Sequence, residues 1–350
     1  MITDVVLHFP ANINPDNISL ATTILLATGT TCMTPAPTTW VLTDGSAGNE
    51  RQSLALARAL SAATPRIWRL EARAPWSLAA PQKLPGSKRA FGQLFEVTLR
   101  EPPMLAIGCG RQAALATRLL REAGARCVQI LDPRIDPRHW DAVIVPEHDR
   151  VRGPNVVTAV GSLHDVDADW LAQARARFPQ FGEQPSPRVL LLLGGPIGGV
   201  PLDAAWWKRT AEVLRVRHAR DGGSLSICAS PRTPSWLVAA ARNDLSNFPG
   251  ARWFAAGDGP NPYAGLLSWA ERIVVSPDSV NMISEAIATS ASVSIASPEL
   301  ARGRHGRFVQ SLVAGGRAQA LNADAAQTGQ VRPLVELPGI VAAVRKLIRM

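Results

Sequence analysis

The sequence predicts an α/β protein made of two Rossmann-like parallel-sheet domains that face a cleft. Short apolar segments without polar alternation recur along the chain, separated by segments of helical length, as is typical of parallel sheets covered on both faces. This series stops at residues 178–187, where three prolines and a glycine indicate a linker, and then begins again. The length of 350 residues suits two such domains.

The first domain is expected at residues 36–180. Its segments are apolar runs bounded by Gly, Pro or Asp, and the proline pair 102–103 ends one helix because proline cannot donate a helical hydrogen bond. Strands are predicted at 39–43, 67–70, 104–107, 127–131, 142–145 and 156–159, and helices at 50–62, 91–100, 112–123 and 168–177.

The second domain is expected at residues 188–330. The same reasoning predicts strands at 189–193, 224–228, 253–254, 273–275 and 292–296, and helices at 206–219, 235–241, 263–270 and 281–288. Residues 331–350 carry a basic amphipathic helix over 338–349. We expect it to pack back on the first domain; resting on an anionic membrane surface is the alternative.

Residues 1–35 are rich in Thr, Asn and Pro and lack the basic start of a signal peptide. They are expected to form a poorly ordered extension, and residues 1–32 are open to being an artefact of the chosen start. No run of 18 apolar residues occurs, so no membrane-spanning helix is expected. The expected location is the cytoplasm, with peripheral contact to the inner membrane as an option.

The net charge of +9 comes mostly from dispersed arginines. It fits a phosphate-bearing ligand or an anionic membrane surface, although a GC-rich genome would produce the same bias. Aromatic residues are not interleaved with basic ones, so nucleic acid is not an expected partner. The four cysteines and six histidines show no metal-ligand spacing, and no metal site or cofactor is expected.

The most informative segment is residues 272–286. A buried strand is followed by Ser276, Asp278 and Ser279, and a helix starts near Asp278 or Ser279 and carries Asn281 and Glu285. Free N–H groups at a helix start bind anions, and a carboxylate two turns on suits the vicinal diol of a ribose. The alternative is a capped helix with a surface glutamate, since Ser and Asp are ordinary N-caps.

Each half has a Gly-rich loop directly after its first strand, where backbone N–H groups can converge on an anion. The alternative is a tight strand–helix turn. A third loop fits Gly-x-Gly-x-x-Ala and has Asp132 about 20 residues on, which is the spacing of a dinucleotide site and allows an NAD-dependent enzyme. The loop residues singled out are Asp44, Gly45, Gly48 and Glu50, then Gly194 and Gly195, then Gly108, Gly110 and Arg111.

Three further positions follow predicted strands or precede helices. Arg232 and Thr233 lie at the edge of the second sheet, and Asn261 and Tyr263 precede a helix, where they would wrap a base or sugar or form a plain turn. His148 ends a strand and is a candidate general base, with helix capping as the alternative.

These motifs occur together in the order of a known family. Asp44-Gly45 with Gly48, Gly108–Arg111, Pro146-x-His148-Asp149, Gly194-Gly195, Arg232–Pro234, Asn261–Tyr263 and Pro277–Ala286 resemble the bacterial relatives of the plant mitochondrial-fission factor of the elongated-mitochondria type, over about residues 38–325. More distantly, Gly194-Gly195 and residues 276–285 are similar to the lipid II-forming N-acetylglucosamine transferase, a GT-B enzyme.

The resemblance implies a GT-B fold, with the acceptor in the first domain and a nucleotide sugar held mainly by the second. It implies that Glu285 binds the ribose, that Ser279 and Asn281 meet the diphosphate under Gly194-Gly195, and that Arg232 stabilises the leaving diphosphate without a metal. Family members often have His where this chain has Asn49, so Asp44, Glu50 or His148 would have to act as the base.

The resulting hypothesis is a metal-independent glycosyltransferase that moves a sugar from a nucleoside diphosphate to a lipid or saccharide acceptor of the cell envelope. A non-catalytic adaptor that binds a protein partner is the alternative from another class, and the NAD-dependent enzyme is the third.

Overall fold

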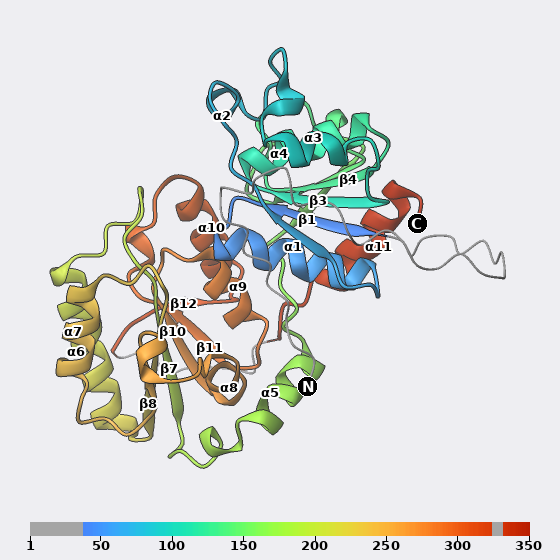
Figure 1. Ribbon diagram of the computed structural model, residues 1–350. Helices are drawn as coiled ribbons and strands as arrows, with labels where there is room; N and C mark the ends of the chain where they lie inside the picture. Colours follow the sequence, from blue (N-terminus) through green and yellow to red (C-terminus); the bar gives the residue numbers. More distant parts are fainter. Residues whose placement is uncertain (1–37, 324–331) are drawn as a thin grey trace. The chain divides into compact units, whose positions relative to one another are not determined.

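Two six-stranded parallel sheets organise the part of the chain that the structure describes. The structure is a computed structural model that describes residues 38–323 and 332–350, and Figure 1 shows it as a ribbon. The predicted extension at residues 1–35 lies outside the described residues.

The first sheet has the strand order β2-β1-β3-β4-β5-β6, and all its pairs are parallel. β1 and β3 are buried over their whole length, as expected of strands covered on both faces. The strands are β1 (Thr39–Thr43), β2 (Arg66–Arg69), β3 (Leu105–Cys109), β4 (Arg126–Ile130), β5 (Ala142–Pro146) and β6 (Val156–Ala159).

The second sheet has the order β12-β11-β10-β7-β8-β9, again with parallel pairs. Its strands are β7 (Arg188–Leu193), β8 (Ser224–Ala229), β9 (Arg252–Trp253), β10 (Arg272–Val275), β11 (Ser292–Ile295) and β12 (Gln319–Ala320). The sequence predicts all of them except the two-residue β12. The predicted class, two Rossmann-like parallel sheets, is therefore confirmed.

Helices follow the strands as the βαβ pattern requires. The α-helices are α1 (Ala47–Leu60), α2 (Trp76–Ala79), α3 (Gln93–Thr98), α4 (Arg111–Glu122), α5 (Ala168–Arg177), α6 (Ala204–Asp221), α7 (Ser235–Asp244), α8 (Tyr263–Trp269), α9 (Val280–Ile287), α10 (Gly303–Ala314) and α11 (Leu337–Ile348). Short 3-10 turns stand at Ser87–Arg89, Pro137–His139, Pro179–Phe181, Ala256–Asp258 and Pro298–Leu300.

The first sheet separates two hydrophobic clusters. On one face, Phe95 of α3 and the apolar side of α4 pack against Trp40 and Trp140; on the other, α1 and α11 cover Val41 and Ile107. Figure 1 shows this layering. The core of the second sheet is one continuous cluster that includes Trp206 and Phe308.

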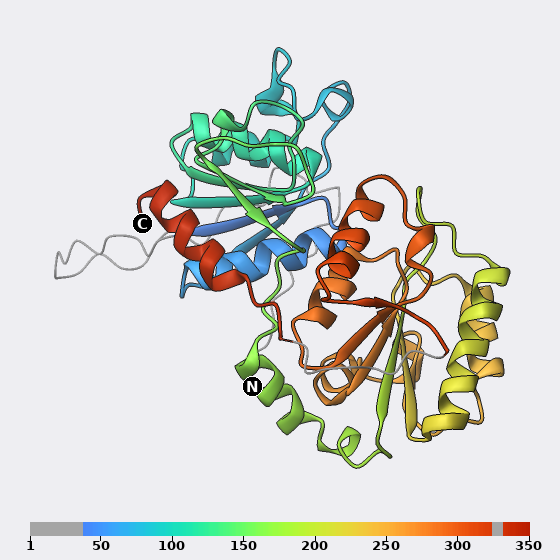
Figure 2. The ribbon, with the colours of Figure 1, turned by 180° about the vertical axis from the view of Figure 1, so that it is seen from behind.

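The last helix belongs to the first sheet. α11 packs against α1, β5 and β6, and its Ile340, Val341, Val344 and Ile348 are buried there. Figure 2 shows it in red beside the blue α1. The carboxylate of Glu336, just before α11, accepts hydrogen bonds from the backbone N–H of Val160 at 2.9 Å and of Gly161 at 3.2 Å.

The chain passes from the first sheet to the second earlier than the expected linker at 178–187. α5 packs on α8, and Leu171 and Phe181 belong to the cluster of the second sheet. The reason is that Phe181 is a core residue on a 3-10 turn, although its proline-rich surroundings are typical of a linker. The crossing falls between β6 and α5.

Two helices were not predicted, the four-residue α2 and the longer α10. α10 begins with Gly303 and contains Gly306, and these glycines and its basic first turn obscure the apolar positions Phe308, Val309 and Leu312. This omission matters because α10 reaches the candidate site.

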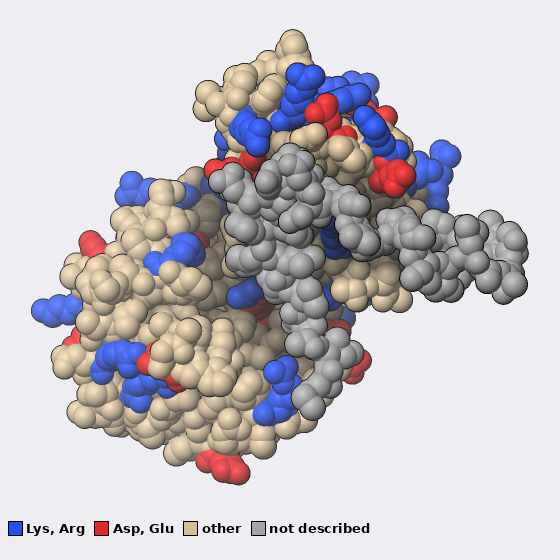
Figure 3. Space-filling model, viewed as in Figure 1, with Lys and Arg blue, Asp and Glu red and all other residues tan. Residues whose placement is uncertain are grey.

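Charges are dispersed in space as they are in sequence. On the face seen in Figure 3, basic and acidic side chains are interspersed and form no single basic block. Among the described helices, none is both long and apolar enough to cross a membrane.

The packing of α11 can be tested with Val344→Ala. Val344 is fully buried, so its truncation should lower the free energy of unfolding by about 2 kcal/mol. Val216→Ala, at a side chain on α6 that is 43% exposed, is the control and should change little. Urea unfolding followed by circular dichroism measures both, and equal midpoints would contradict this packing.

Candidate functional site

A cavity of about 420 Å³ lies at the carboxyl ends of the strands of both sheets. Open α/β sheets bind ligands at such edges, next to the point where the strand order reverses. Here those points lie between β1 and β3 and between β7 and β10. The lining residues include Asn49, Gln52, Ile130, Leu131, Ile144, Val145, His148, Asp149, Ser162 and Leu163 from the first half, and Arg232, Asp278, Ser279, Asn281, Arg304 and His305 from the second.

The junction of β10 and α9 forms part of the second-half wall. Ser279 is the N-cap of α9 and its hydroxyl accepts the N–H of Met282 at 3.4 Å. Ser279 and Asn281 both line the cavity. The start of α9 therefore presents N–H groups and the positive end of the helix dipole to the cavity.

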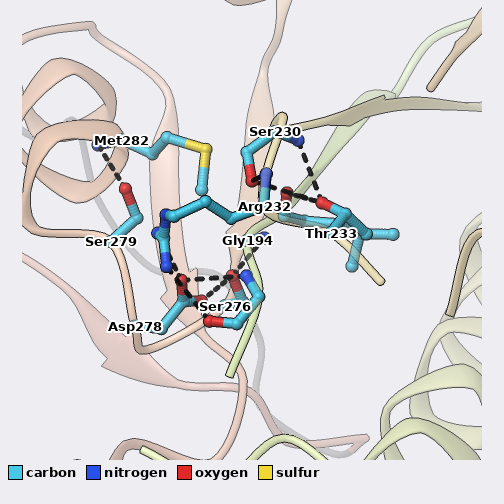
Figure 4. A network of polar contacts seen from close by, with 10 residues as sticks. Gly194, Ser230, Arg232, Thr233, Ser276, Asp278, Ser279 and Met282 are labelled. Carbon is cyan, nitrogen blue, oxygen red and sulfur yellow. Dashed lines mark hydrogen bonds and ion pairs between the residues drawn. The ribbon is translucent and has the colours of Figure 1, made fainter. Parts of the chain in front are cut away.

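Asp278 lines the cavity, and its contacts hold the neighbouring loops together. Its side chain is fully buried and accepts hydrogen bonds from Ser276 Oγ at 2.6 Å and Arg232 Nη2 at 2.8 Å (Figure 4). It also accepts a hydrogen bond from Gly195 N at 3.1 Å. A buried carboxylate needs such partners. Arg232 also donates to the carbonyl of Gly195 at 3.2 Å. The network fixes the direction in which Arg232 enters the cavity.

The glycines of the β7 loop serve this network. A Cβ on Gly194 would collide with the carboxylate of Asp278, and a Cβ on Gly195 with the carbonyl oxygen of Arg232. The N–H of Gly194 is bound by Ser276 Oγ at 2.8 Å, and that of Gly195 by Asp278. Neither N–H is free in this structure, so the contacts of the pair are with the protein.

Thr233 and Asn261 stabilise the loops in which they lie by hydrogen bonds to the backbone. The hydroxyl of Thr233 donates to the carbonyl of Leu193 at 2.9 Å and accepts the N–H of Ser230 at 3.0 Å. Asn261 Oδ1 accepts the N–H of Tyr263 at 2.9 Å at the start of α8. Neither residue lines the cavity.

Glu285 is buried, and both oxygens of its carboxylate accept hydrogen bonds from other side chains. Its Oε1 accepts from Arg51 Nη1 of α1 at 2.9 Å, and its Oε2 accepts from the hydroxyl of Tyr263. Burial, and then the nearby Glu285 carboxylate, raise the pKa of Tyr263 well above its usual value, which keeps the phenol a donor. A ribose at Glu285 would therefore have to replace one of these partners.

A hydrogen bond and an ion pair stabilise the loop after β1 and the start of α1. Asn49 Nδ2 donates to Asp44 Oδ1 at 3.1 Å, and Glu50 forms a two-pronged ion pair with Arg69 at 2.8 and 2.9 Å. Gly45 has a φ of +83°. Of this loop's named residues, Asn49 lines the cavity, whereas Asp44 and Glu50 do not.

Gly48 has a separate role. A Cβ there would collide with the side-chain amide of Asn281, so this glycine lets α1 lie directly on the start of α9.

The loop after β3 is built into the first half. Gly110, with a φ of +92°, receives Gln129 Nε2 on its carbonyl at 3.2 Å, and a Cβ on Gly108 would lie 2.8 Å from Gln129 Oε1. Arg111 donates to the carbonyls of Leu78 and Ala80 at 3.3 and 3.4 Å. Gly108, Gly110 and Arg111 do not line the cavity.

His148 follows β5 and is the one candidate base that lines the cavity. Its ring centroid lies 5.7 Å from that of Phe308 on α10. Burial lowers the pKa of His148 below its ordinary value, and the neighbouring Asp149 offsets this only in part. The imidazole is therefore neutral near pH 7 and able to accept a proton.

α10 contributes two cavity residues that the sequence analysis missed. Arg304 Nη1 lies 3.8 Å from Asp149 Oδ2 of the first half, and His305 follows it. Burial lowers the pKa of His305. The signal that could have found them is the basic run Arg302–Arg307 shortly before the apolar Phe308 and Val309.

The second-half wall thus carries two guanidinium groups, Arg232 and Arg304, beside a helix start, a combination that can bind a phosphate-bearing ligand. Within residues 38–323 and 332–350, no group of three or more His, Cys, Asp or Glu side chains is placed to hold a metal ion.

Comparison with known proteins connects this arrangement to one family. The model of the family described as mitochondrial fission ELM1 matches residues 47–348. Mitochondrial fission protein ELM1 of Arabidopsis thaliana is 28% identical over 240 residues. The aligned part covers 61% of this chain and 56% of the plant protein, so the chain spans little more than half of that relative.

Solved structures share the fold. The UDP-glucosyltransferase of Polygonum tinctorium has a TM-score of 0.50 and 12% identity, with 90% of this chain and 94% of that chain covered. The UDP-GlcNAc 2-epimerase of Neisseria meningitidis, bound to UDP-GlcNAc, has the same score and identity, with 89% and 100% covered. MurG of Acinetobacter baumannii has a TM-score of 0.44 and 14% identity, with 81% of this chain and 84% of that chain covered. At these identities the likeness concerns the GT-B fold alone.

The Asp278 network can be tested with Asp278→Asn. The amide keeps the shape but removes the charge that holds Arg232, so unfolding should become easier by about 2 kcal/mol. Asp136→Asn breaks the exposed pair with Arg138 and should have no measurable effect. Thermal unfolding compares the two, and equal effects would show that the network does not stabilise the fold.

Proposed function

This chain belongs to the mitochondrial fission ELM1 family, and on that premise we propose that it is a GT-B glycosyltransferase. It would move a sugar from a nucleoside diphosphate to a hydroxyl group of an acceptor. The observation that carries the proposal is the cavity in which Arg232, Arg304 and the start of α9 stand on the second-half wall and His148 on the first-half wall.

The diphosphate of the donor would lie on the second-half wall. Arg232, held by Asp278, and Arg304 would bind its oxygens together with the N-terminus of α9, Ser279 and Asn281. Two guanidinium groups can neutralise the charge that develops on a leaving diphosphate, the task that a metal ion performs in other enzymes.

The nucleoside would reach Glu285 by replacing Arg51. The carboxylate accepts one hydrogen bond from Arg51 and one from Tyr263, and the ribose hydroxyls would take the place of the Arg51 donor while Tyr263 stays bound. The proteins of similar fold include one bound to UDP-GlcNAc and one named as a UDP-glucosyltransferase, and uridine diphosphate is therefore the probe of choice.

His148 is the base in this proposal. The acceptor oxygen attacks the anomeric carbon, its proton passes to the neutral imidazole, and the bond from that carbon to the diphosphate oxygen breaks. Asp44 contacts Asn49 and Glu50 pairs with Arg69, so neither side chain is directed to the acceptor. The acceptor would belong to the cell envelope and be modified from the cytoplasmic side.

The donor site can be tested by titrating UDP in a calorimeter. Glu285→Ala should weaken binding at least tenfold because the ribose loses its acceptor. Arg51→Ala should tighten binding about threefold to tenfold, since the competing guanidinium is gone. Arg58→Ala, at an exposed pair on the same helix, should bind as the wild type does. Weaker binding by Arg51→Ala would mean that Arg51 binds the donor.

The base can be tested by the pH dependence of UDP release from UDP-N-acetylglucosamine or UDP-glucose. The rate should be maintained at pH 6.5 and fall only at lower pH, because the pKa of His148 lies below its ordinary value and the protonated ring cannot accept a proton. His148→Gln should lower the rate on the order of 100-fold. His139→Gln, outside the cavity, is the control. An acid limb that persists in His148→Gln would contradict this role.

A non-catalytic adaptor is the second candidate, and the occupied Glu285 favours it. The Arg51–Glu285–Tyr263 contact joins the two halves through the protein's own side chains, which suits a protein-binding module of fixed shape. No binding of UDP by the wild type or by Arg51→Ala would support the adaptor over the transferase.

A further inference from the structure

The two walls of the cavity differ in chemistry. Arginines and a helix start line the second-half wall, as described above. The first-half wall is mostly hydrocarbon, from the carboxyl ends of β4, β5 and β6 and the segment that follows: Ile130, Leu131, Ile144, Val145, Ala159 and Leu163. A ligand that fills the cavity must therefore be polar on one side and apolar on the other.

The backbone conformation of Leu131 indicates that the apolar wall is a ligand site and not ordinary hydrophobic core. Leu131 has a φ of +71°, in the left-handed region that glycine and asparagine adopt far more readily than leucine. Its N–H is bound to the carbonyl of Ile144 at 2.8 Å, which holds this conformation. Backbone outliers of this kind gather at ligand sites. Here the outlier brings a leucine to the cavity.

One hydroxyl in the apolar wall lacks a partner. Ser162 is 9% exposed and lines the cavity, and its Oγ has no hydrogen-bond partner among the described residues, although its N–H is bound by Ser284 Oγ at 2.9 Å. A buried hydroxyl without a partner costs free energy, and a single polar group on a ligand would remove that cost.

We propose that the acceptor is an alcohol with an apolar body, either an isoprenoid or an aromatic one. The body would pack on Leu131 and its neighbours, with the hydroxyl toward His148. This inference rests on the proposed transferase. A saccharide fits less well, because each hydroxyl buried against the apolar part of this wall would need a hydrogen-bond partner. The polar side chains of the first-half wall are Asn49, Gln52, His148, Asp149 and Ser162, and the rest of its lining is largely hydrocarbon.

Binding can be measured without the donor. Geraniol and 1-naphthol represent the isoprenoid and aromatic forms, and methyl β-glucopyranoside represents a saccharide. Saturation-transfer NMR on the full chain should show saturable binding of at least one alcohol and none of the glucoside. Binding of geraniol alone assigns an isoprenoid acceptor, and binding of 1-naphthol alone an aromatic one. Binding of the glucoside alone, or of no probe, would overturn the inference.

Leu131→Asn is the decisive variant. Asparagine suits the left-handed backbone at this position, so the fold should be kept while the wall becomes polar. Binding of the alcohol should weaken at least tenfold. Leu94→Asn, at a side chain on α3 that is 61% exposed, is the matched control and should not change it. Unaltered binding by Leu131→Asn, at an unaltered melting temperature, would also overturn the inference.

A UDP titration on the same sample separates this inference from the proposed function. If UDP binds and neither alcohol does, the acceptor class is wrong and the donor site stands. If an alcohol binds and UDP does not, the apolar site stands and the transferase fails.

Discussion

The direct contact between α9 and the first half determines the geometry of the cleft. Two glycines make it possible: side chains at Gly48 and Gly161 would collide with Asn281 and Ser284 of α9. A third contact, from Glu285 to Arg51, lies on the same helix. Ser284 and Glu285 lie three and four positions after Asn281, so a single polar face of α9 carries all three contacts with the first half.

This contact explains why one wall of the candidate site is polar and the other is apolar. Because α9 is pressed against the first half, its N-terminus and the arginines of the second half come to face the ends of β4 to β6. The fully buried Asp278 forms an ion pair with Arg232 and so fixes the position of its guanidinium group. The polar wall is thus positioned by hydrogen bonds and the apolar wall by the backbone of the first sheet, including the left-handed Leu131.

Much of the fold could be predicted because its signals are local. The apolar runs identify the strands, and the start of α9 is expected at Asp278 or Ser279, of which Ser279 is the N-cap in the structure. The sequence did not predict α10, because its glycines conceal the helical periodicity. It also did not identify the hydrogen-bond partners of Glu285. Arg51 lies 234 residues away in sequence, and no local pattern reports such a pair. Asp278 and Gly194-Gly195 are predicted donor-binding residues, and no local pattern shows that Asp278 also joins their two loops through Gly195 and Arg232.

The return of α11 to the first sheet has a consequence for the synthesis of this protein. The face of that sheet bearing Val41 and Ile107 is covered partly by residues 337–348, which are synthesised after the second sheet. The domain made first therefore cannot fully cover that face of its sheet until α11 has been synthesised, although all strands of the second sheet precede α11 in the chain. During elongation an apolar surface stays open, which makes the nascent chain a natural client for chaperones.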